Sequence, residues 1–233
     1  MKLAIVIPTY YKKDGSTASH LQKTLESIRS QSHQDYFVYL IGDDYEDYQE
    51  FKKLSLIIDP SKIKAVNLTV AVEREKYTGQ NLWLCGGTNA NNFGIQMAQA
   101  DNLNYVCHLD HDDLWTPNHL DEINKVLELT KSNFICTRAN YATFNVIIPQ
   151  VFTSDYYLRY LPEANQIIHS STCVNFKYFD MKYRNTIEEC SQPAPGDADL
   201  WNRISQFYLD NNEFGILINK CTVLQESERS CMR

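Results

Sequence analysis

The sequence predicts an α/β domain in which helices flank a central, mostly parallel sheet. One observation is that short apolar runs alternate with segments of helical spacing over the first half of the 233 residues, in the order βαβαβαβ. Another is that acidic clusters follow the second and fourth runs, at Asp43-Asp44 and Asp110–Asp113. Ligands of such sheets bind beyond the carboxyl ends of the strands. The length suits one domain, so we expect residues 1–233 to form a single unit.

The elements of the first half follow from the spacing of apolar residues. Leu21, Leu25 and Ile28 recur at helical spacing, which predicts a helix over about residues 18–31. A short helix is expected around residues 48–54, a polar loop over 76–88, and a helix with a small-residue face around Ala90 and Gly94. The expected strands are Leu3–Ile7, Phe37–Ile41, Lys64–Val72 and Leu103–Leu109.

The second half is less regular. A helix is expected around residues 120–127, with Thr116-Pro117 at its start because proline suits a first turn. A second helix is expected over Asp197–Phe207. The expected strands are Phe134–Thr137, Asn145–Phe152, Phe214–Ile218 and Thr222–Leu224. No stretch is long enough to separate two domains.

The composition excludes several classes of function. With 22 Lys and Arg against 29 Asp and Glu, the net charge of −7 does not suit a protein that coats nucleic acid or an anionic membrane. An acidic chain would also repel a sugar diphosphate unless a cation or a local basic group bridges the two. No apolar stretch approaches the roughly 20 residues that span a bilayer, and the apolar start before Pro8 is too short for a signal peptide.

Seven cysteines are widely spaced without a C-x-x-C pair. This pattern favours buried, reduced thiols over a zinc site or a disulfide framework, and it predicts a soluble protein of a reducing, cytoplasmic compartment.

The strongest chemical motif is Asp110-x-Asp112-Asp113, directly after an expected strand. Carboxylates this close repel one another unless they are solvated or bind a cation, and Mg²⁺ and Mn²⁺ prefer oxygen ligands. The alternative is a solvated turn or a helix cap. Asp43-Asp44 after the second strand could accept hydrogen bonds from a base N–H or a ribose hydroxyl, although an ordinary turn is the simpler interpretation.

A third acidic pair, Asp197 and Asp199, opens an amphipathic helix. Its carboxylates could cap the helix, or one of them could act as a general base held rigidly at the helix start. His108, Asp110 and Asp112 alternate like a two-carboxylate, one-histidine metal site, but His108 is expected to be a packed strand residue. Sugar stacking and core packing are equally open for four tyrosines: Tyr141, Tyr156, Tyr157 and Tyr160.

Taken in order, these motifs resemble the family-2 glycosyltransferases, which have the nucleotide-diphospho-sugar transferase (GT-A) fold. The likeness is best over residues 3–115 and 168–204. It rests on six segments: Ile5–Tyr10 (usually V-I-P-T-Y-N), Leu25–Ser32 (with its S-I-x-x-Q ending), Ile41–Asp44, Ala90–Ile95 (A-R-N-x-G-I), Leu109–Asp113 (L-D-x-D-D) and Gly196–Arg203 (E-D-x-D-L-W-x-R).

The resemblance implies a single Rossmann-like catalytic domain, with residues 1–115 binding the nucleotide sugar and residues 116–233 binding the acceptor. It implies transfer of a sugar from a nucleotide-diphosphate sugar, expected to be a UDP-sugar, to a glycan or another hydroxyl acceptor, with inversion. Asp112 and Asp110 would hold Mn²⁺ or Mg²⁺, and Asp197 would be the general base. Donor-binding residues would be Pro8, Thr9, Tyr11, Asp43, Asp44, Arg74, Asn92, Asp110 and His111. On the acceptor side we expect Trp115, His169, Asp199 and Trp201.

Three departures bear on these assignments. Tyr11 replaces the asparagine of T-Y-N, and Gly196 replaces the glutamate of E-D. The choice of Asp197 over Asp199 as the base therefore rests on the Leu-Trp-x-Arg that follows. Residues 224–230 contain no histidine where many relatives have a metal ligand, so the third ligand stays open.

Two other functions remain alternatives. A sugar nucleotidyltransferase shares the fold but usually opens with a glycine-rich loop, which residues 8–15 lack. A non-catalytic module that binds a nucleotide sugar or a glycan would bind UDP without turnover.

Overall fold

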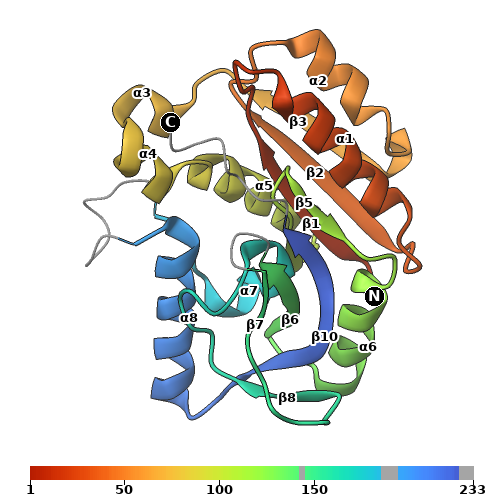
Figure 1. Cartoon of the computed structure of the whole chain (residues 1–233), viewed down its shortest axis with the longest axis vertical. Coiled ribbons are helices and arrows are strands. Elements are labelled where there is room, and N and C mark those ends of the chain that lie inside the picture. The colour runs from red at the N-terminus through yellow and green to blue at the C-terminus, as the bar shows by residue number, and fades with distance from the viewer. Residues whose placement is uncertain (142–144, 185–193, 226–233) are drawn as a thin grey trace.

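The computed structural model describes residues 1–141, 145–184 and 194–225. They form a single α/β domain built on one sheet, with helices packed on both of its faces (Figure 1). The strands follow one another in the order β3-β2-β1-β4-β9-β6-β10-β5, and β7 and β8 pair with β6 and β10. The predicted fold class is confirmed.

The first half supplies the parallel part of the sheet. Its strands are β1 (Leu3–Thr9), β2 (Tyr36–Asp43), β3 (Ile63–Leu68) and β4 (Tyr105–His108), and the pairs β1–β2, β2–β3 and β1–β4 are all parallel. Alternate residues of β1 enter different cores, because side chains of a strand point to opposite faces. Leu3, Ile5 and Ile7 join one core, whereas Ala4 and Val6 join the other.

The helices divide between these two cores. On the first face lie α1 (Ser16–Arg29), α2 (Tyr48–Ser55) and α6 (His119–Thr130). On the second face lie α5 (Thr88–Ala100), α7 (Phe176–Phe179) and α8 (Gly196–Asn211). Figure 1 shows α1, α2 and α6 along one side of the molecule and α8 along the other.

The second half adds strands of both directions. They are β5 (Asp113–Trp115), β6 (Phe134–Tyr141), β7 (Val146–Ile148), β8 (Tyr157–Tyr160), β9 (Thr172–Asn175) and β10 (Gly215–Gln225). Strand β9 is antiparallel to both β4 and β6, whereas β10 is parallel to β6 and antiparallel to β5 and β8. Short 3-10 turns occur at Pro60–Lys62 and His169–Ser171.

Several predicted boundaries were wrong. The third strand ends at Leu68, and residues 72–88 contain α3 (Val72–Lys76) and α4 (Gly79–Cys85) in place of strand and loop. Strand β7 ends at Ile148, since Pro149 has no N–H to donate to the ladder. The two predicted C-terminal strands are one, β10, which continues across two shifts of register against β6. Pro117 lies in the turn before α6, whose first residue is His119.

The described cysteines carry free thiols: Cys85, Cys107, Cys136 and Cys173 are buried and Cys221 is half-buried. Cys190 and Cys231 lie outside the described residues. In the part of the chain that the structure describes, no helix has both the length and the apolar character that crossing a membrane requires.

Candidate active site

The candidate site lies at the carboxyl ends of β1, β2 and β4, beside the first turns of α5 and α8. Residues 109–112 connect β4 to β5, and the acidic motif spans this loop and Asp113, the first residue of β5. This loop is held against α1 by Thr24, whose Oγ1 lies 2.9 Å from the carbonyl oxygens of both His111 and Asp113. The position is the one at which α/β sheets bind their ligands.

The three carboxylates of the loop have different surroundings. Asp110 is 39% exposed, and its Oδ1 lies 2.7 Å from His169 Nδ1. Asp113 is buried and accepts a hydrogen bond from the Ser170 hydroxyl at 2.6 Å. Asp112 Oδ2 accepts no hydrogen bond from the described residues, although the Lys12 ammonium lies 3.5 Å away. Partners on Asp110 and Asp113 relieve the mutual repulsion and leave Asp112 as the least satisfied of the three.

His169 links Asp110 to Tyr183. Its Nδ1 donates to Asp110, because an ionised carboxylate only accepts, and its Nε2 lies 2.7 Å from the Tyr183 hydroxyl. Burial lowers the pKa of His169, but the charges of Asp110 and Asp197 and the hydrogen bond to Asp110 outweigh it and raise the pKa. Burial acts to raise the pKa of Asp110, but the charge and the hydrogen bond of His169 outweigh burial. The pKa of Asp110 is therefore lowered overall.

Asp197 and Asp199 share the first turn of α8 but not the same environment. Burial raises the pKa of Asp197 above its usual value, and its Oδ1 accepts the backbone N–H of Ala198 at 2.8 Å. Asp199 is buried and paired with Arg184 at 3.1 Å and with Arg203 at 2.9 Å. The Asp199 carboxylate therefore holds neighbouring arginines in place, whereas Asp197 carries the perturbed pKa expected of a general base.

Gly196 precedes Asp197 where α8 approaches α5. A Cβ atom at this position would lie 2.6 Å from Thr88 Cγ2. At this distance the two atoms would clash unless Thr88 or the start of α8 moved. The glycine is thus required by the close packing of the two helix starts. A glutamate, as in the usual motif, would not fit here unless Thr88 moved.

The residues predicted to bind the donor base line the ends of β1 and β2. Asp43 is buried and accepts a hydrogen bond from Arg74 Nε at 3.0 Å, while Asp44 is exposed with φ 51°. Burial raises the pKa of Asp43, and the Arg74 charge opposes that rise. Asp43 Oδ1 and Thr9 Oγ1 are buried without a hydrogen-bond partner among the described residues. Unpaired buried polar atoms are rare unless a ligand supplies the partner. Pro8 and Tyr11, by contrast, are half-buried.

The structure places other predicted residues in the interior. Asn92 is buried and forms two 2.8 Å hydrogen bonds with the backbone of Tyr183, so it fixes that segment. His111 is buried, and its ring lies nearly perpendicular to that of Tyr10, with the centroids 5.2 Å apart. Trp115 stacks on a buried histidine, and Trp201 is fully buried in the second core. Burial gives both tryptophans a packing role, and we leave them out of the proposed acceptor site.

Sequence reasoning gave no role to Lys12 or Tyr183, and it placed Ser170 only beside His169, as an ordinary loop or the border of the acceptor site. Lys12 directly follows Thr9-Tyr10-Tyr11, the counterpart of T-Y-N, and its position there was a usable signal. Ser170 adjoins His169 in sequence, but no pattern indicates that its hydroxyl reaches Asp113. Nothing in the spacing around Tyr183 connects it to Asn92, 91 positions earlier.

A divalent cation would have to rely on few protein ligands. No three His, Cys, Asp or Glu side chains come together as a cation site within the described ranges. The histidine-free stretch noted above falls largely on residues 226–230, outside the described residues. Mg²⁺ is commonly held by one or two carboxylates together with water and substrate phosphates. The buried Asp112 Oδ2, which accepts no hydrogen bond from the described residues, and the half-exposed Asp110 fit that arrangement.

Comparisons with known proteins extend these observations. No protein-family model matches the sequence. An uncharacterized glycosyltransferase of Acanthamoeba polyphaga mimivirus is 32% identical over 241 residues, covering 99% of this chain and 96% of that protein. The succinoglycan biosynthesis protein ExoW of Rhizobium meliloti is 31% identical over 135 residues, covering 58% of this chain and 36% of ExoW.

Solved structures share the fold at low sequence identity. Staphylococcus aureus TarS 1-349 in complex with UDP-GlcNAc superposes with a TM-score of 0.69 at 14% identity, over 100% of this chain and 60% of that one. The same TarS fragment in complex with UDP gives a TM-score of 0.65 over 96% of this chain and 60% of that one. The chain therefore spans less than two thirds of the TarS fragment.

Proposed function

This chain belongs to the glycosyltransferases, and we propose that it transfers a sugar from a UDP-sugar to an acceptor hydroxyl with inversion at the anomeric carbon. The family membership favours this function over a sugar nucleotidyltransferase. One observation carries the proposed mechanism: the charges of Asp110 and Asp197 both raise the pKa of the same imidazole, that of His169. The residues proposed for the donor and for proton removal thus lie around one side chain.

The donor side is supported by unsatisfied polar atoms. Asp43 Oδ1 and Thr9 Oγ1 are buried without partners, and Arg74 holds the other Asp43 oxygen. A uracil N–H or a ribose hydroxyl would supply the missing hydrogen bonds, which are costly to leave unmade. Structures of the same fold in TarS hold UDP and UDP-GlcNAc, which supports uridine as the nucleoside.

Asp112 is the proposed protein ligand of a divalent cation, Mn²⁺ or Mg²⁺, with Asp110 beside it. When bound, the cation supplies positive charge that stabilises the departing diphosphate. The hydrogen bond from His169 occupies Asp110 Oδ1 and restrains the carboxylate. Asp110 therefore presents its second oxygen in a set direction.

Asp197 is the proposed general base. The first turn of α8 holds it rigidly, and its raised pKa makes its carboxylate a stronger base than a solvated aspartate. It would take the proton of the acceptor hydroxyl as the oxygen attacks the anomeric carbon and the UDP leaves. Asp199 is a poorer candidate, because two arginines occupy its oxygens.

Thermal unfolding with a panel of nucleoside diphosphates tests the donor and the cation together. We expect UDP with Mn²⁺ to raise the melting temperature, since a ligand of the native state alone stabilises it by about 2.7 kcal/mol at a hundred times its dissociation constant. GDP, ADP and CDP should give no comparable shift, and EDTA should reduce the effect of UDP.

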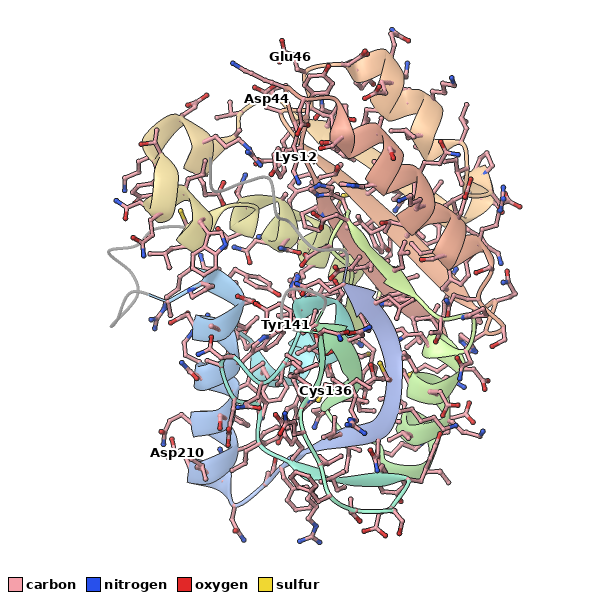
Figure 2. The ribbon with its side chains drawn as sticks, in the orientation of Figure 1. Lys12, Asp44, Glu46, Cys136, Tyr141 and Asp210 are labelled. Atoms are coloured by element: carbon pink, nitrogen blue, oxygen red, sulfur yellow. The ribbon has the colours of Figure 1, made fainter. Side chains whose placement is uncertain are left out.

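Asp112→Asn should abolish the Mn²⁺-dependent part of the shift and the hydrolysis of UDP-sugars. Asp210→Asn is a matched control, because Asp210 lies at the far, exposed end of α8 (Figure 2). No shift with any nucleotide would overturn the proposed donor. An unchanged Mn²⁺ effect in Asp112→Asn would overturn the proposed ligand.

A further inference from the structure

Lys12 lies in a hydrogen-bonded turn between β1 and α1. Its backbone N–H donates to Thr17 Oγ1 at 2.9 Å, and its carbonyl accepts the N–H of Gly15 at 2.9 Å. Gly15 has φ 74°, a left-handed conformation that glycine adopts without strain. The turn directs the Lys12 side chain to the loop after β4, where its Nζ lies 3.5 Å from Asp112 Oδ2. Figure 2 labels Lys12 at the upper end of the parallel strands.

The Lys12 side chain is only 9% exposed. A buried ammonium is costly unless strong partners replace its water. Arg74 and His169 each hold their site carboxylate through a hydrogen bond, at 3.0 and 2.7 Å. The contact of Lys12 with Asp112 is longer, and the Asp112 oxygen that faces it accepts no hydrogen bond. Of these three contacts, the one between Lys12 and Asp112 is the longest, and Asp112 Oδ2 is left able to accept a second cation.

A second cation stands beside Lys12. Lys12 Nζ lies 5.7 Å from the centroid of the Tyr10 ring, and Arg74 Cζ lies 3.6 Å from the same centroid. Two positive groups therefore flank one aromatic ring directly after β1. In a chain of net charge −7, this is a local basic group of the kind that a diphosphate requires.

We propose that Lys12 exchanges partners when the donor binds. In the donor-free protein its ammonium neutralises Asp112; in the complex the divalent cation takes Asp112, and Lys12 turns to the diphosphate oxygens. The two cations cannot both stay at one carboxylate oxygen, because like charges a few ångströms apart repel strongly in a partly buried site. A phosphate is a suitable second partner for a lysine. This inference rests on the proposed use of a nucleotide-diphosphate donor.

Lys12→Met tests the exchange, with Lys13→Met as the matched control, because Lys13 is its exposed neighbour with the same charge. Calorimetry would measure Mn²⁺ binding to the donor-free protein and UDP binding in EDTA. Without the competing ammonium, Lys12→Met should bind Mn²⁺ about tenfold more tightly. Without the phosphate partner, it should bind UDP about tenfold more weakly. Lys13→Met should match the wild type in both.

Two further variants keep the test decisive. Lys12→Arg preserves the charge and should keep the wild-type Mn²⁺ affinity, which excludes a general loosening of the fold. Adding Asp112→Asn to Lys12→Met should remove the gain in Mn²⁺ affinity. Unchanged Mn²⁺ binding in Lys12→Met overturns the exchange, and unchanged UDP binding overturns the phosphate contact. A wild type that binds no UDP refutes the proposed donor, while the Mn²⁺ measurement still decides the competition at Asp112.

Discussion

Asp197 and Asp199 show how much the immediate partners of a side chain decide its role. Both open α8, and from the sequence either could be the base. Arg203, one helical turn after Asp199, was visible as a partner, but Arg184 reaches Asp199 only through the tertiary fold. Asp197 carries no such ion pair among the described residues, and burial raises its pKa. Two neighbouring carboxylates thus acquire different chemistry from their surroundings alone.

Asp197→Asn should lower kcat by about a hundredfold or more, because a positioned general base contributes at least that factor. In the wild type, kcat/KM should fall as pH drops through the pKa of Asp197, which lies above the ordinary aspartate value of about 3.9. The raised pKa also means that the folded state loses stability as pH rises through it, since the ionised form is the penalised one. At neutral pH the Asn variant should therefore unfold at the same or a higher temperature.

The control is Asp210→Asn on the same helix, which should keep wild-type kcat and the wild-type pH profile. Kinetics between pH 4 and 8 and thermal unfolding of the wild type, Asp197→Asn and Asp210→Asn would test whether Asp197 is the base. A variant that loses activity only because it is less stable would contradict the assigned role.

At the scale of elements, α5 matters because it packs directly across β1 and β2. Gly94 on this helix faces the sheet so closely that a Cβ atom would lie 2.6 Å from Val6 Cγ1 and 3.3 Å from Ile41 Cγ1. The small-residue face around Ala90 and Gly94 was visible in the sequence, and its helix was confirmed. What spacing could not reveal is which strands need that close approach.

Gly94→Ala should destabilise the protein by about 1–3 kcal/mol, because overpacking outweighs the gain of roughly 1 kcal/mol in helix propensity. Gln96→Ala on the exposed face of the same helix is the control and should change stability by no more than about 0.5 kcal/mol. Urea unfolding of both variants measures these changes in the free energy of unfolding. Equal stability of the two would contradict the close packing of α5.

Elements that sequence reasoning missed share a physical cause. Helices α3 and α4 have only 5 and 7 residues, too few for a 3.6-residue period to emerge. Strand β5 has 3 residues and begins at Asp113. It was not predicted because its first residue belongs to the acidic motif and the strand is too short to show apolar alternation. Strand β10 was divided because its register against β6 shifts around Cys221, where apolar alternation is interrupted. Long elements with a clear period, such as α1 and β2, were predicted well.

At the scale of the whole molecule, the predicted halves are joined by one sheet. Strands β4 and β9 connect the parallel part to the mixed part, and both cores draw residues from both halves. Trp115 lies in the first core and Trp201 in the second. The parallel part was predictable from its apolar runs. The antiparallel pairs were not, because they join segments whose partners are distant in sequence.

This continuity predicts a single cooperative unfolding transition. Trp83 is 62% exposed, so a Trp83→Phe protein would report fluorescence from the two buried tryptophans alone. Its fluorescence and far-UV circular dichroism should change at the same urea concentration, as a two-state unit requires. Separate transitions would mean that residues 1–115 and 116–233 are independently stable.

The pairing of β5 with β10 determines when, during synthesis of the chain, the acidic loop of the proposed site can take its final position. The acidic loop is held between β4 and β5, and β5 gains its ladder partner only from residues 113–115 meeting 223–225. On the ribosome, the amino-terminal strands can pair while synthesis continues. The loop that carries Asp110 and Asp112 nevertheless waits for a segment translated about 110 residues later. The proposed site of a nascent chain is thus complete only when β10, the last described strand, has been made.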